Sequence, residues 1–464
     1  MKTHPNTLGN LRRGVASVLA MMYLVLFSTL ALGFYAATTT TVQTSDNYKR
    51  IAEAHNAAEA GMQFMRYQLG MMSIPASTPQ NQLFAAVYTQ LQNQINNTGN
   101  LAGGTISSDG VTIYVPGNTA QTISLDASNS RFRARVFQNG PQLRVIVNGY
   151  SSSGLKRSLQ MDYNVAQRAS AIFDYGVASK SAITMNGNVT ITGLTNPAAG
   201  SVLSATLSTN TPLTMVGNDS ISGDVSLVNP NSSVSVSSSS SIAGSTNPSS
   251  YASHIHTGVD MPEFPTIDTS PFAPYATNNI TASKPAGKSF SNIRIKANTN
   301  PSFAANTTIT GVVYIETPNQ VSFAGNLTLQ GVVVVQNNPT GNTTTNTISF
   351  GGNVAMSGVD TLPASFGALR TLTGAAILAP NFAVSFGGNF GSINGSIIGS
   401  SMNFHGNAGG TVTGSVINLN DTAMSFSGND TIKIQSQGTS NFPAGVKFGS
   451  DYVPLPDTYL EIIE

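Results

Sequence analysis

Histidine and carboxylate side chains that could carry out chemistry gather in one short stretch of the chain. His254 and His256 are separated by one residue, and Asp260, Glu263 and Asp268 follow them. On a strand, a His-x-His pair would place both imidazoles on one face, where Asp260 could complete a metal site. Because two histidines in a proline-rich loop are more often structural or exposed, we predict no metal and no cofactor. The role of His254, His256 and Asp260 stays open.

Elsewhere the residues needed for catalysis are scattered. General acid–base chemistry on a polysaccharide requires paired carboxylates within reach of one bond. The chain has no cysteine, and no nucleophile-elbow sequence is present. We therefore predict no catalytic residue and no enzymatic activity. The remaining acids of residues 176–440 occur singly, at Asp219, Asp224, Glu316, Asp360, Asp421 and Asp430.

The overall composition argues against nucleic-acid binding. Of the 464 residues only 9% are charged, the formal net charge is +1, and 40% are hydrophobic. Nucleic-acid binding needs clustered lysine and arginine to neutralise phosphates, so we predict no nucleic-acid partner. The hydrophobic content is too high for a disordered chain and fits a β-rich protein with hydroxyl and amide surfaces.

The N-terminal part of the sequence predicts a long helix that begins in a membrane. Residues 15–37 are uncharged, and as a helix they would span ~34 Å, enough for a ~30 Å hydrocarbon core. Lys2, Arg12 and Arg13 precede this run, so the N-terminus should stay in the cytoplasm and the rest should be exported. The helical pattern continues without a proline through residues 38–74, which predicts one continuous rod.

Two short sequences stand out on this part of the chain. The leader of residues 1–14 ends in Arg12-Arg13-Gly14, and the rod carries the helix motif Ala57, Ala58, Glu59, Ala60 and Gly61. Together they resemble type IV pilins, specifically the PilX N-terminal domain family of pilus assembly proteins. The resemblance implies cleavage between Gly14 and Val15, other pilin-like subunits as partners, and a single-pass place in a bacterial inner membrane. The usual pilin carries a glutamate where this chain has Leu19, and PilX-type proteins often lack that glutamate.

Residues 75–175 predict a small α+β region. A short amphipathic helix with apolar residues at four-residue spacing ends near Asn97, and alternating segments then predict an antiparallel meander with Asn-Gly and Ser-Gly turns. This layout is the one expected of a pilin head. Four arginines could share one face of the sheet, either as a site for an anionic polymer or partner or as a solvated strand face. They are Arg131, Arg133, Arg135 and Arg144.

Residues 176–440 contain a repeat that predicts a parallel β-helix, or β-solenoid. Apolar-x-apolar pairs precede an asparagine, and the last five intervals between these asparagines are 20, 27, 36, 18 and 22 residues, the 36 suggesting two coils of 18. Stacked asparagines could form corners with an amide ladder, while the scarcity of aspartate argues against calcium. The predicted corner residues are Asn188, Asn218, Asn306, Asn326, Asn353, Asn389, Asn407 and Asn429.

The complete prediction is a mixed α and β protein with a transmembrane helix, a pilin-like α+β region and a C-terminal β-solenoid. A proline-rich excursion at 251–290 interrupts the solenoid, and 441–464 is expected to be a C-terminal tail. The resemblance and the Ser/Thr/Asn-rich faces favour a pilus component that displays the solenoid, with adhesion to a carbohydrate as a hypothesis. Two alternatives stay open: a membrane-anchored, polysaccharide-active or carbohydrate-binding solenoid protein, and a scaffold that polymerises through solenoid ends.

Overall fold

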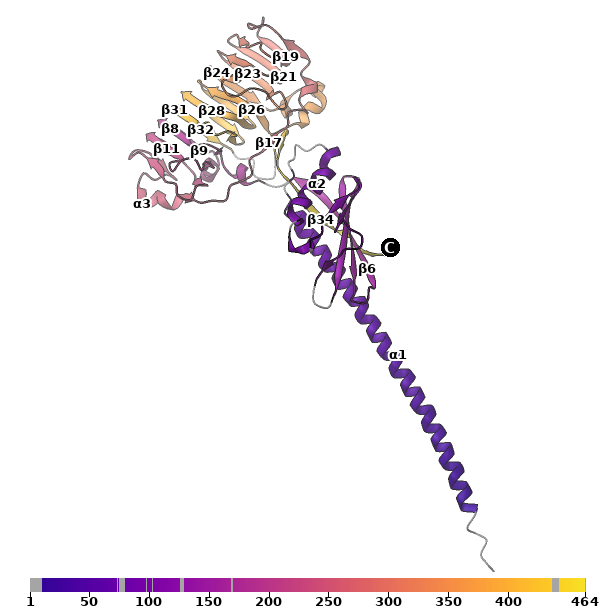
Figure 1. Cartoon of the computed structure of the whole chain (residues 1–464). Coiled ribbons are helices and arrows are strands. Elements are labelled where there is room, and N and C mark those ends of the chain that lie inside the picture. The colour runs from indigo at the N-terminus through magenta and orange to yellow at the C-terminus, as the bar shows by residue number, and fades with distance from the viewer. Residues whose placement is uncertain are drawn as a thin grey trace, which may run out of the picture. The chain divides into compact units, whose positions relative to one another are not determined.

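The computed structural model (Figure 1) describes residues 11–463, except for 73, 75–79, 97, 102, 126–128, 168–169 and 436–441. The chain forms two compact units. The N-terminal unit comprises Met1–Ile74, Pro79–Ala166 and Asp451–Glu464, and the solenoid unit is built from Gln167–Ser450. The predicted fold class is confirmed, because a long apolar helix precedes a β-rich region with a large parallel sheet.

Helix α1 (Leu11–Gly70) is the main element of the N-terminal unit and is ~90 Å long. Its first part is exposed on every side, whereas from Ala54 onward one face is buried. The buried face carries apolar side chains three and four residues apart, such as Met62, Met65 and Leu69. Helix α2 (Gln80–Ile95) adds Val87, Leu91 and Ile95 to the same core.

The sheet of this unit has the strand order β1-β2-β4-β5-β6-β34, and β3 also pairs with β4. The strands β1 to β6 pair antiparallel, as the alternation of apolar and polar residues predicted. One face, with Phe132, Ala134 and Val136, packs against α1. The strands are β1 (Ser107–Ser108), β2 (Thr112–Val115), β3 (Ile123–Ser124), β4 (Arg131–Asn139), β5 (Gln142–Tyr150), β6 (Lys156–Gln167) and β34 (Ser450–Ile462), with the short helix η1 (Gly99–Leu101) before them.

The structure differs from the sequence prediction at the C-terminal end. Residues 441–464 were expected to be a tail, but most of them form β34, the edge strand beside β6. Pro454 and Pro456 hide the strand pattern, yet an edge strand accepts proline because one row of its N–H groups needs no partner. Thr458 Oγ1 accepts a hydrogen bond from the Asp162 N–H (2.8 Å), and Arg157 pairs with Glu461 (3.0 Å).

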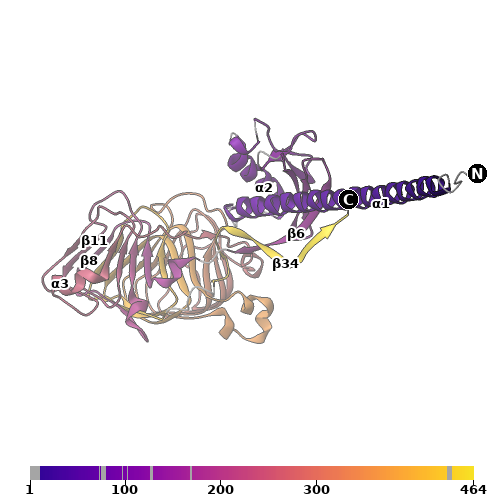
Figure 2. The same ribbon diagram turned by 90° about the horizontal axis from the view of Figure 1, so that it is seen from below.

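The solenoid unit is a stack of parallel strands (Figure 2). The pairings between successive coils divide these strands into three faces. Face A contains β8 (Ile183–Gly187), β11 (Leu213–Gly217), β14 (Val234–Val236), β20 (Ser302–Phe303), β22 (Gln320–Phe323), β24 (Thr347–Phe350) and β31 (Met424–Gly428), with the second halves of β26 (Ala375–Phe386) and β28 (Ser396–Gly406). Face B contains β9 (Thr190–Gly193), β12 (Ser220–Ile221), β15 (Ser241–Ile242), β25 (Val354–Ser357), β27 (Phe390–Asn394), β29 (Gly409–Thr413) and β32 (Thr431–Ile434), with the first halves of β19 (Ser289–Ile295), β21 (Thr307–Ile315) and β23 (Leu327–Val335).

Face C contains β7 (Val177–Ser179), β10 (Val202–Ser204), β13 (Val225–Leu227), β16 (Ile255–Thr257), β18 (Asn278–Ile280) and β30 (Val416–Asn418), with the second halves of β19, β21 and β23 and the first halves of β26 and β28. Side chains that point outward from this face are also buried, because connecting segments cover them with residues such as Phe173, Phe272 and Leu369. The covering and capping elements are η2 (Ala171–Asp174), η3 (Pro197–Gly200), α3 (Pro248–Tyr251), η4 (Ala252–His254), η5 (Ala273–Tyr275), η6 (Val359–Thr361), η7 (Ala364–Thr371) and the pair β17 (Thr266–Ile267) with β33 (Val446–Lys447).

The coils are not stacked in chain order. The first coil, β7 to β9, pairs on one side with β10 to β12 and on the other with the last coil, β30 to β32. After β16 the chain passes through the segment that contains β17 and η5 and resumes stacking at β18, from which the coils run back until β32 meets β9. The repeat in the sequence therefore predicted stacking but not this order.

A ladder of phenylalanines fills the interior behind face A. Neighbouring rings lie 4.8 to 5.3 Å apart between centroids and are within 17° of parallel. The ladder also corrects the expected division of the 36-residue interval into two coils, because Phe350 pairs directly with Phe386 in one step of the stack. The extra residues form η6 and η7 instead. The ladder consists of Phe303, Phe323, Phe350, Phe386, Phe404 and Phe426.

Candidate functional site

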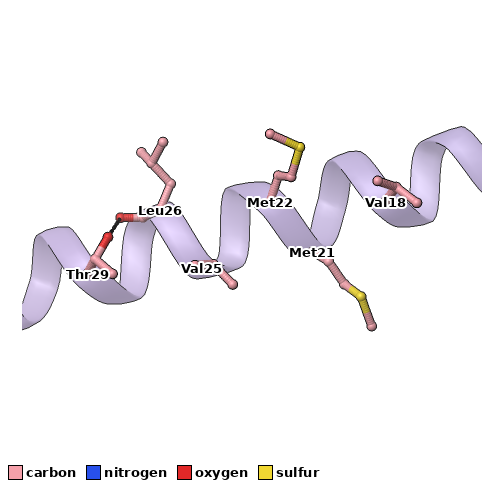
Figure 3. Close-up of a pocket in the computed structure, with 6 residues that line it drawn as sticks. All are labelled: Val18, Met21, Met22, Val25, Leu26 and Thr29. Carbon is pink, nitrogen blue, oxygen red and sulfur yellow. Dashed lines mark hydrogen bonds between the residues drawn. The ribbon is translucent and has the colours of Figure 1, made fainter.

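The first candidate site is the exposed apolar segment of α1. Over the described residues, α1 is the one helix long and apolar enough, by length and composition, to cross a membrane. Its apolar side chains face away from the rest of the unit, with Leu24 at 70% and Leu32 at 68% exposed. Figure 3 shows Val18, Met21, Met22, Val25, Leu26 and Thr29 projecting from successive turns. Exposing so large a continuous apolar surface to water is energetically unfavourable, whereas a bilayer or neighbouring apolar helices would bury it.

Hydroxyl groups in and beside this segment are satisfied within the helix itself. Ser28 Oγ donates to the Leu24 carbonyl oxygen (2.6 Å), and Thr29 Oγ1 donates to that of Leu26 (2.9 Å). At the end of the apolar run, four consecutive threonines each donate to the carbonyl four residues earlier, at 2.7 to 2.9 Å. Such back-bonding removes the need for water, which makes the segment suitable for a hydrocarbon environment.

The pilin-like helix motif forms the contact between α1 and the sheet. Ala57, Ala58 and Gly61 are buried. A Cβ atom on Gly61 would lie 2.6 Å from side-chain atoms of Phe132 and Val147, so only glycine fits at this position. Glu59 of the same motif is half exposed, and its carboxylate accepts a hydrogen bond from the Tyr459 hydroxyl. The motif therefore places small residues where the helix must approach the strands.

Gly149 is the matching residue on the sheet, and sequence reasoning assigned it a different role. Asn148-Gly149 was expected to form a turn, but both residues lie inside β5. A Cβ on Gly149 would lie 2.2 Å from the Ala54 carbonyl oxygen and the Ala58 backbone nitrogen. The glycine is therefore required by the close approach of α1, which the local Asn-Gly signal could not reveal.

The four arginines of the sheet do share one face, but each has a partner. Arg144 forms a bidentate pair with Asp162 at 2.7 and 2.8 Å, and its hydrogen bonds hold the pKa of that carboxyl below its usual value. The Arg131 guanidinium lies over Tyr150 (5.8 Å) and that of Arg133 over the Tyr114 ring (5.6 Å). Arg135 is also engaged. These contacts favour a structural role over the anionic-polymer site.

The histidine cluster has a different composition from the predicted one. His254 Nδ1 lies 2.7 Å from Asp224 Oδ1 and His256 Nε2 lies 3.3 Å from Asp224 Oδ2. These bonds, that of His254 first, hold the pKa of Asp224 below its usual value. The partner of the histidines is Asp224 and not Asp260. Strand β16, which contains His256, stacks directly on β13, and Asp224 immediately precedes β13. Across the described part of the chain, no group of three or more metal-binding side chains is arranged to hold an ion.

The predicted corner asparagines lie along one edge of the stack, and several form an amide ladder. Asn218 Nδ2 donates to Asn188 Oδ1 (3.0 Å), Asn188 Nδ2 to Asn429 (2.7 Å), and Asn429 Nδ2 to Asn407 (3.3 Å). The ladder thus joins residues that are 241 positions apart in the chain. In the other coils, Asn326 donates to Asn306 (3.1 Å) and accepts from the Asn353 N–H (3.2 Å), while the Asn389 backbone carbonyl accepts from Val354 (3.0 Å).

Two carboxylates behind this ladder were read only as isolated acids. Asp430 Oδ1 accepts from the Ala408 N–H (2.8 Å) and Oδ2 from the Ser427 N–H (3.0 Å), so the side chain joins two coils. Asp219 Oδ1 accepts from the Val189 N–H (3.0 Å) and so also joins two coils. Burial raises the pKa of Asp430 to about 6, against the opposing effect of its two backbone hydrogen bonds. The sequence signal is an aspartate directly after a Gly-Asn step, at Asn218 and Asn429.

The predicted leader falls mostly outside the described residues, which begin at Leu11. The backbone from Leu11 to Gly14 already belongs to α1, and Val15 follows in the same helix. Cleavage between Gly14 and Val15 stays a prediction.

Comparisons with known proteins give no family assignment. No family model and no curated protein matches the chain. Among solved structures, it is similar to the competence-associated pilin ComZ from Thermus thermophilus, with 12% identity over 89% of this chain and 97% of that chain and a TM-score of 0.21. It is also similar to an ice-binding protein from the Antarctic ascomycete Antarctomyces psychrotrophicus, with 11% identity over 57% of this chain and 95% of that chain and a TM-score of 0.16. Because both TM-scores are below 0.5, no function is transferred from either structure.

Proposed function

We propose that the protein is a membrane-anchored, pilin-like structural subunit that carries the solenoid unit on the outside of a bacterial cell. The observation that supports this most is the difference in burial between the two parts of α1. One continuous helix has a fully exposed apolar segment before Ala37 and a second part, from Ala54, that is packed into the core of a folded unit. Such a helix couples a folded body rigidly to whatever medium surrounds its apolar end.

The proposed orientation and pathway follow from the sequence. The positive charges of Arg12 and Arg13 favour a cytoplasmic N-terminus in the inner membrane, with the remainder exported. The resemblance of residues 12–16 and 57–61 to PilX-type proteins supports processing after Gly14 and assembly with other pilin-like subunits. Leu19 would then contribute an apolar contact between helices where other pilins place a glutamate.

The role we propose for the solenoid unit is recognition at the cell surface rather than catalysis. Three of its carboxylates are used in structure: Asp430 joins coils, Asp224 binds two histidines, and Asp268 pairs with Lys447 at 2.6 Å. A rigid stack with hydroxyl and amide side chains on its faces suits adhesion to another surface. An enzymatic role would need a carboxylate pair free to act on substrate, and these three are already engaged.

The anchoring proposal is tested on cells that express the full chain. Leu26→Arg places a charge at the middle of the apolar segment, where insertion costs about 2.5 to 3.5 kcal/mol, so membrane retention should fall at least tenfold. Val42→Arg is the matched control, because Val42 is similarly exposed (66% against 59% for Leu26) but lies beyond the segment. Mass spectrometry of the purified protein should give a mature N-terminus at Val15. A soluble protein that begins after Ala37 would overturn the proposal.

A further inference from the structure

Two interruptions of the solenoid repeat meet around one pocket. The first is η5, which belongs to the proline-rich excursion, and the second is η7, which belongs to the insertion between β25 and β26. The pocket has a volume of about 480 Å³, within the range of roughly 300–1,000 Å³ that is usual for small-ligand sites. It is lined by Pro274, Tyr275, Thr277, Asn292, Ser365, Phe366, Gly367 and Ala368.

The lining combines two aromatic rings with neutral hydrogen-bonding groups. Tyr275 and Phe366 are each only partly buried, so part of each ring stays accessible. Thr277 and Ser365 supply hydroxyls, Asn292 supplies an amide, and no charged side chain lines the pocket. An ionic ligand would lose its hydration here without gaining a counter-charge. A sugar suits the set, because its C–H faces pack on aromatic rings while its hydroxyls pair with amides and hydroxyls.

The Arg294 side chain holds one wall of the pocket in place. Arg294 lies over the Tyr314 ring (4.6 Å), and its guanidinium donates to the carbonyl oxygens of Ala276 (3.1 Å) and Ala273 (2.5 Å). These bonds attach η5 to strand β19. The fully buried Phe272 fixes the other end of this turn. Tyr275 is therefore carried on an anchored segment, which reduces the entropy lost when a ligand binds.

The amide side chain that lines the pocket, that of Asn292, is also held in place. Asn292 lies where the register between β19 and β21 shifts, has a left-handed backbone (φ 46°), and accepts the Val312 N–H through Oδ1 (3.2 Å). Its Nδ2 group makes no hydrogen bond to any other described residue. A Cβ on Gly311 would lie 2.0 Å from Asn292 Oδ1 and 2.9 Å from Phe366, so this glycine is what lets both residues reach the same place.

We propose that this pocket binds a short segment of a neutral polysaccharide, with its sugar rings against Tyr275 and Phe366 and a hydroxyl accepting from Asn292 Nδ2. The inference rests on the proposed function only in that surface display would bring the ligand within reach. It specifies a chemical class, an uncharged oligosaccharide, and it assigns a function to two segments that the repeat alone does not require.

Binding is tested with the full-length protein in detergent against immobilised oligosaccharides, using cello-, chito- and maltohexaose as neutral probes and oligogalacturonate as the acidic one. Titration calorimetry then measures the affinity of the neutral probe that is retained. Tyr275→Ala and Asn292→Asp should each weaken it about tenfold or more, because each removes a contact worth roughly 1.4 kcal/mol. The Asn292→Asp variant keeps the Oδ1 atom that accepts from the Val312 N–H. The control for Tyr275→Ala is Tyr48→Ala, which removes an exposed tyrosine from α1.

Three results would overturn the pocket assignment: no neutral probe is retained, only the acidic probe is retained, or both variants bind the neutral probe as wild type does. Thermal unfolding of each variant shows whether a loss of binding reflects loss of fold, and Asn292→Asp remains informative if Tyr275→Ala unfolds. Membrane retention is measured on the same cells. A protein that is anchored but binds no glycan contradicts the pocket alone, whereas one that binds but is soluble contradicts the anchoring alone.

Discussion

The N-terminal unit and the solenoid unit bury their apolar residues by different means. In the first, α1 and α2 pack against one sheet, and α1 comes closest to it where Gly61 faces Phe132 and Gly149 faces the backbone of Ala54 and Ala58. In the second, the same contact recurs from coil to coil, as in the phenylalanine ladder around Phe350. The first core therefore depends on one close approach of helix to sheet, at Gly61 and Gly149, which a Cβ atom would block. The second depends on register, so damage should spread to neighbouring coils.

The largest effect is expected where helix and sheet touch. In Gly149→Ala, the new Cβ would overlap main-chain atoms at 2.2 Å, which no side-chain movement can relieve. We expect the N-terminal unit to lose at least ~4 kcal/mol of stability, with faster hydrogen exchange in β4 to β6. Gly70→Ala is the control, because nothing lies within 4 Å of its Cβ and its effect should stay below ~1 kcal/mol. Similar effects for the two variants would contradict the importance of the close approach at Gly149.

A cavity in the phenylalanine ladder tests the other half of the comparison. Phe350→Ala should cost the solenoid unit about 4 kcal/mol, because the ring is buried between Phe323 and Phe386. Hydrogen exchange should rise in β22 and β26 as well as in β24, since stacked coils support one another. Phe34→Ala, which removes a ring that is 65% exposed on α1, should leave exchange in the solenoid unchanged. Faster exchange confined to β24 would contradict coupling between coils.

The buried carboxylate at Asp430 makes the stack sensitive to pH. Burial raises the pKa of Asp430 to about 6, above its value of ~3.9 in an unfolded chain. The folded state therefore holds the proton more tightly, and this residue's contribution to stability falls as pH rises from ~4 to ~6. In Asp430→Asn this titration is absent.

The measurement for Asp430 is the difference in unfolding free energy between wild type and Asp430→Asn at pH 4 and at pH 7. Relative to the variant, wild type should lose up to ~3 kcal/mol between these two values. Other titrating groups contribute equally to both proteins, so the difference isolates Asp430. A difference that stays constant, or that moves in favour of wild type as pH rises, would contradict the effect of burial.

A smaller effect should appear at the junction between the first and last coils. Asn418 is fully buried, and its Nδ2 donates to Ser179 Oγ (3.0 Å), Ser181 Oγ (2.9 Å) and the Thr422 carbonyl (2.9 Å). Asn418→Ala should cost about 2 kcal/mol, because these buried acceptors lose their donor. Asn403→Ala removes an exposed asparagine from a neighbouring coil and should cost less than ~0.5 kcal/mol. Equal losses would show that the junction is no more sensitive than the surface.

Local patterns in the sequence were sufficient for much of this architecture. The uncharged run before Ala37 and the absence of proline predicted α1, because helix length and hydropathy depend on neighbouring residues. Alternation predicted the meander, and the repeated asparagines predicted the stack and part of its amide ladder. The motif at Ala57–Gly61 was also visible, although its physical reason, the space occupied by Phe132 and Val147, appears only in the structure.

Other features depend on contacts between residues far apart in the chain, so they became visible only in the folded protein. The residues near Gly149 do not reveal that α1 packs against it. Those near Asp224 do not reveal that the chain will return with two histidines beside it. Residues 451–462 do not reveal that they will pair with β6. The order of the coils is of the same kind, since every coil carries a similar surface for stacking. Sequence periodicity determines that coils stack, but the pairing of particular coils is fixed by which complementary edges meet in space.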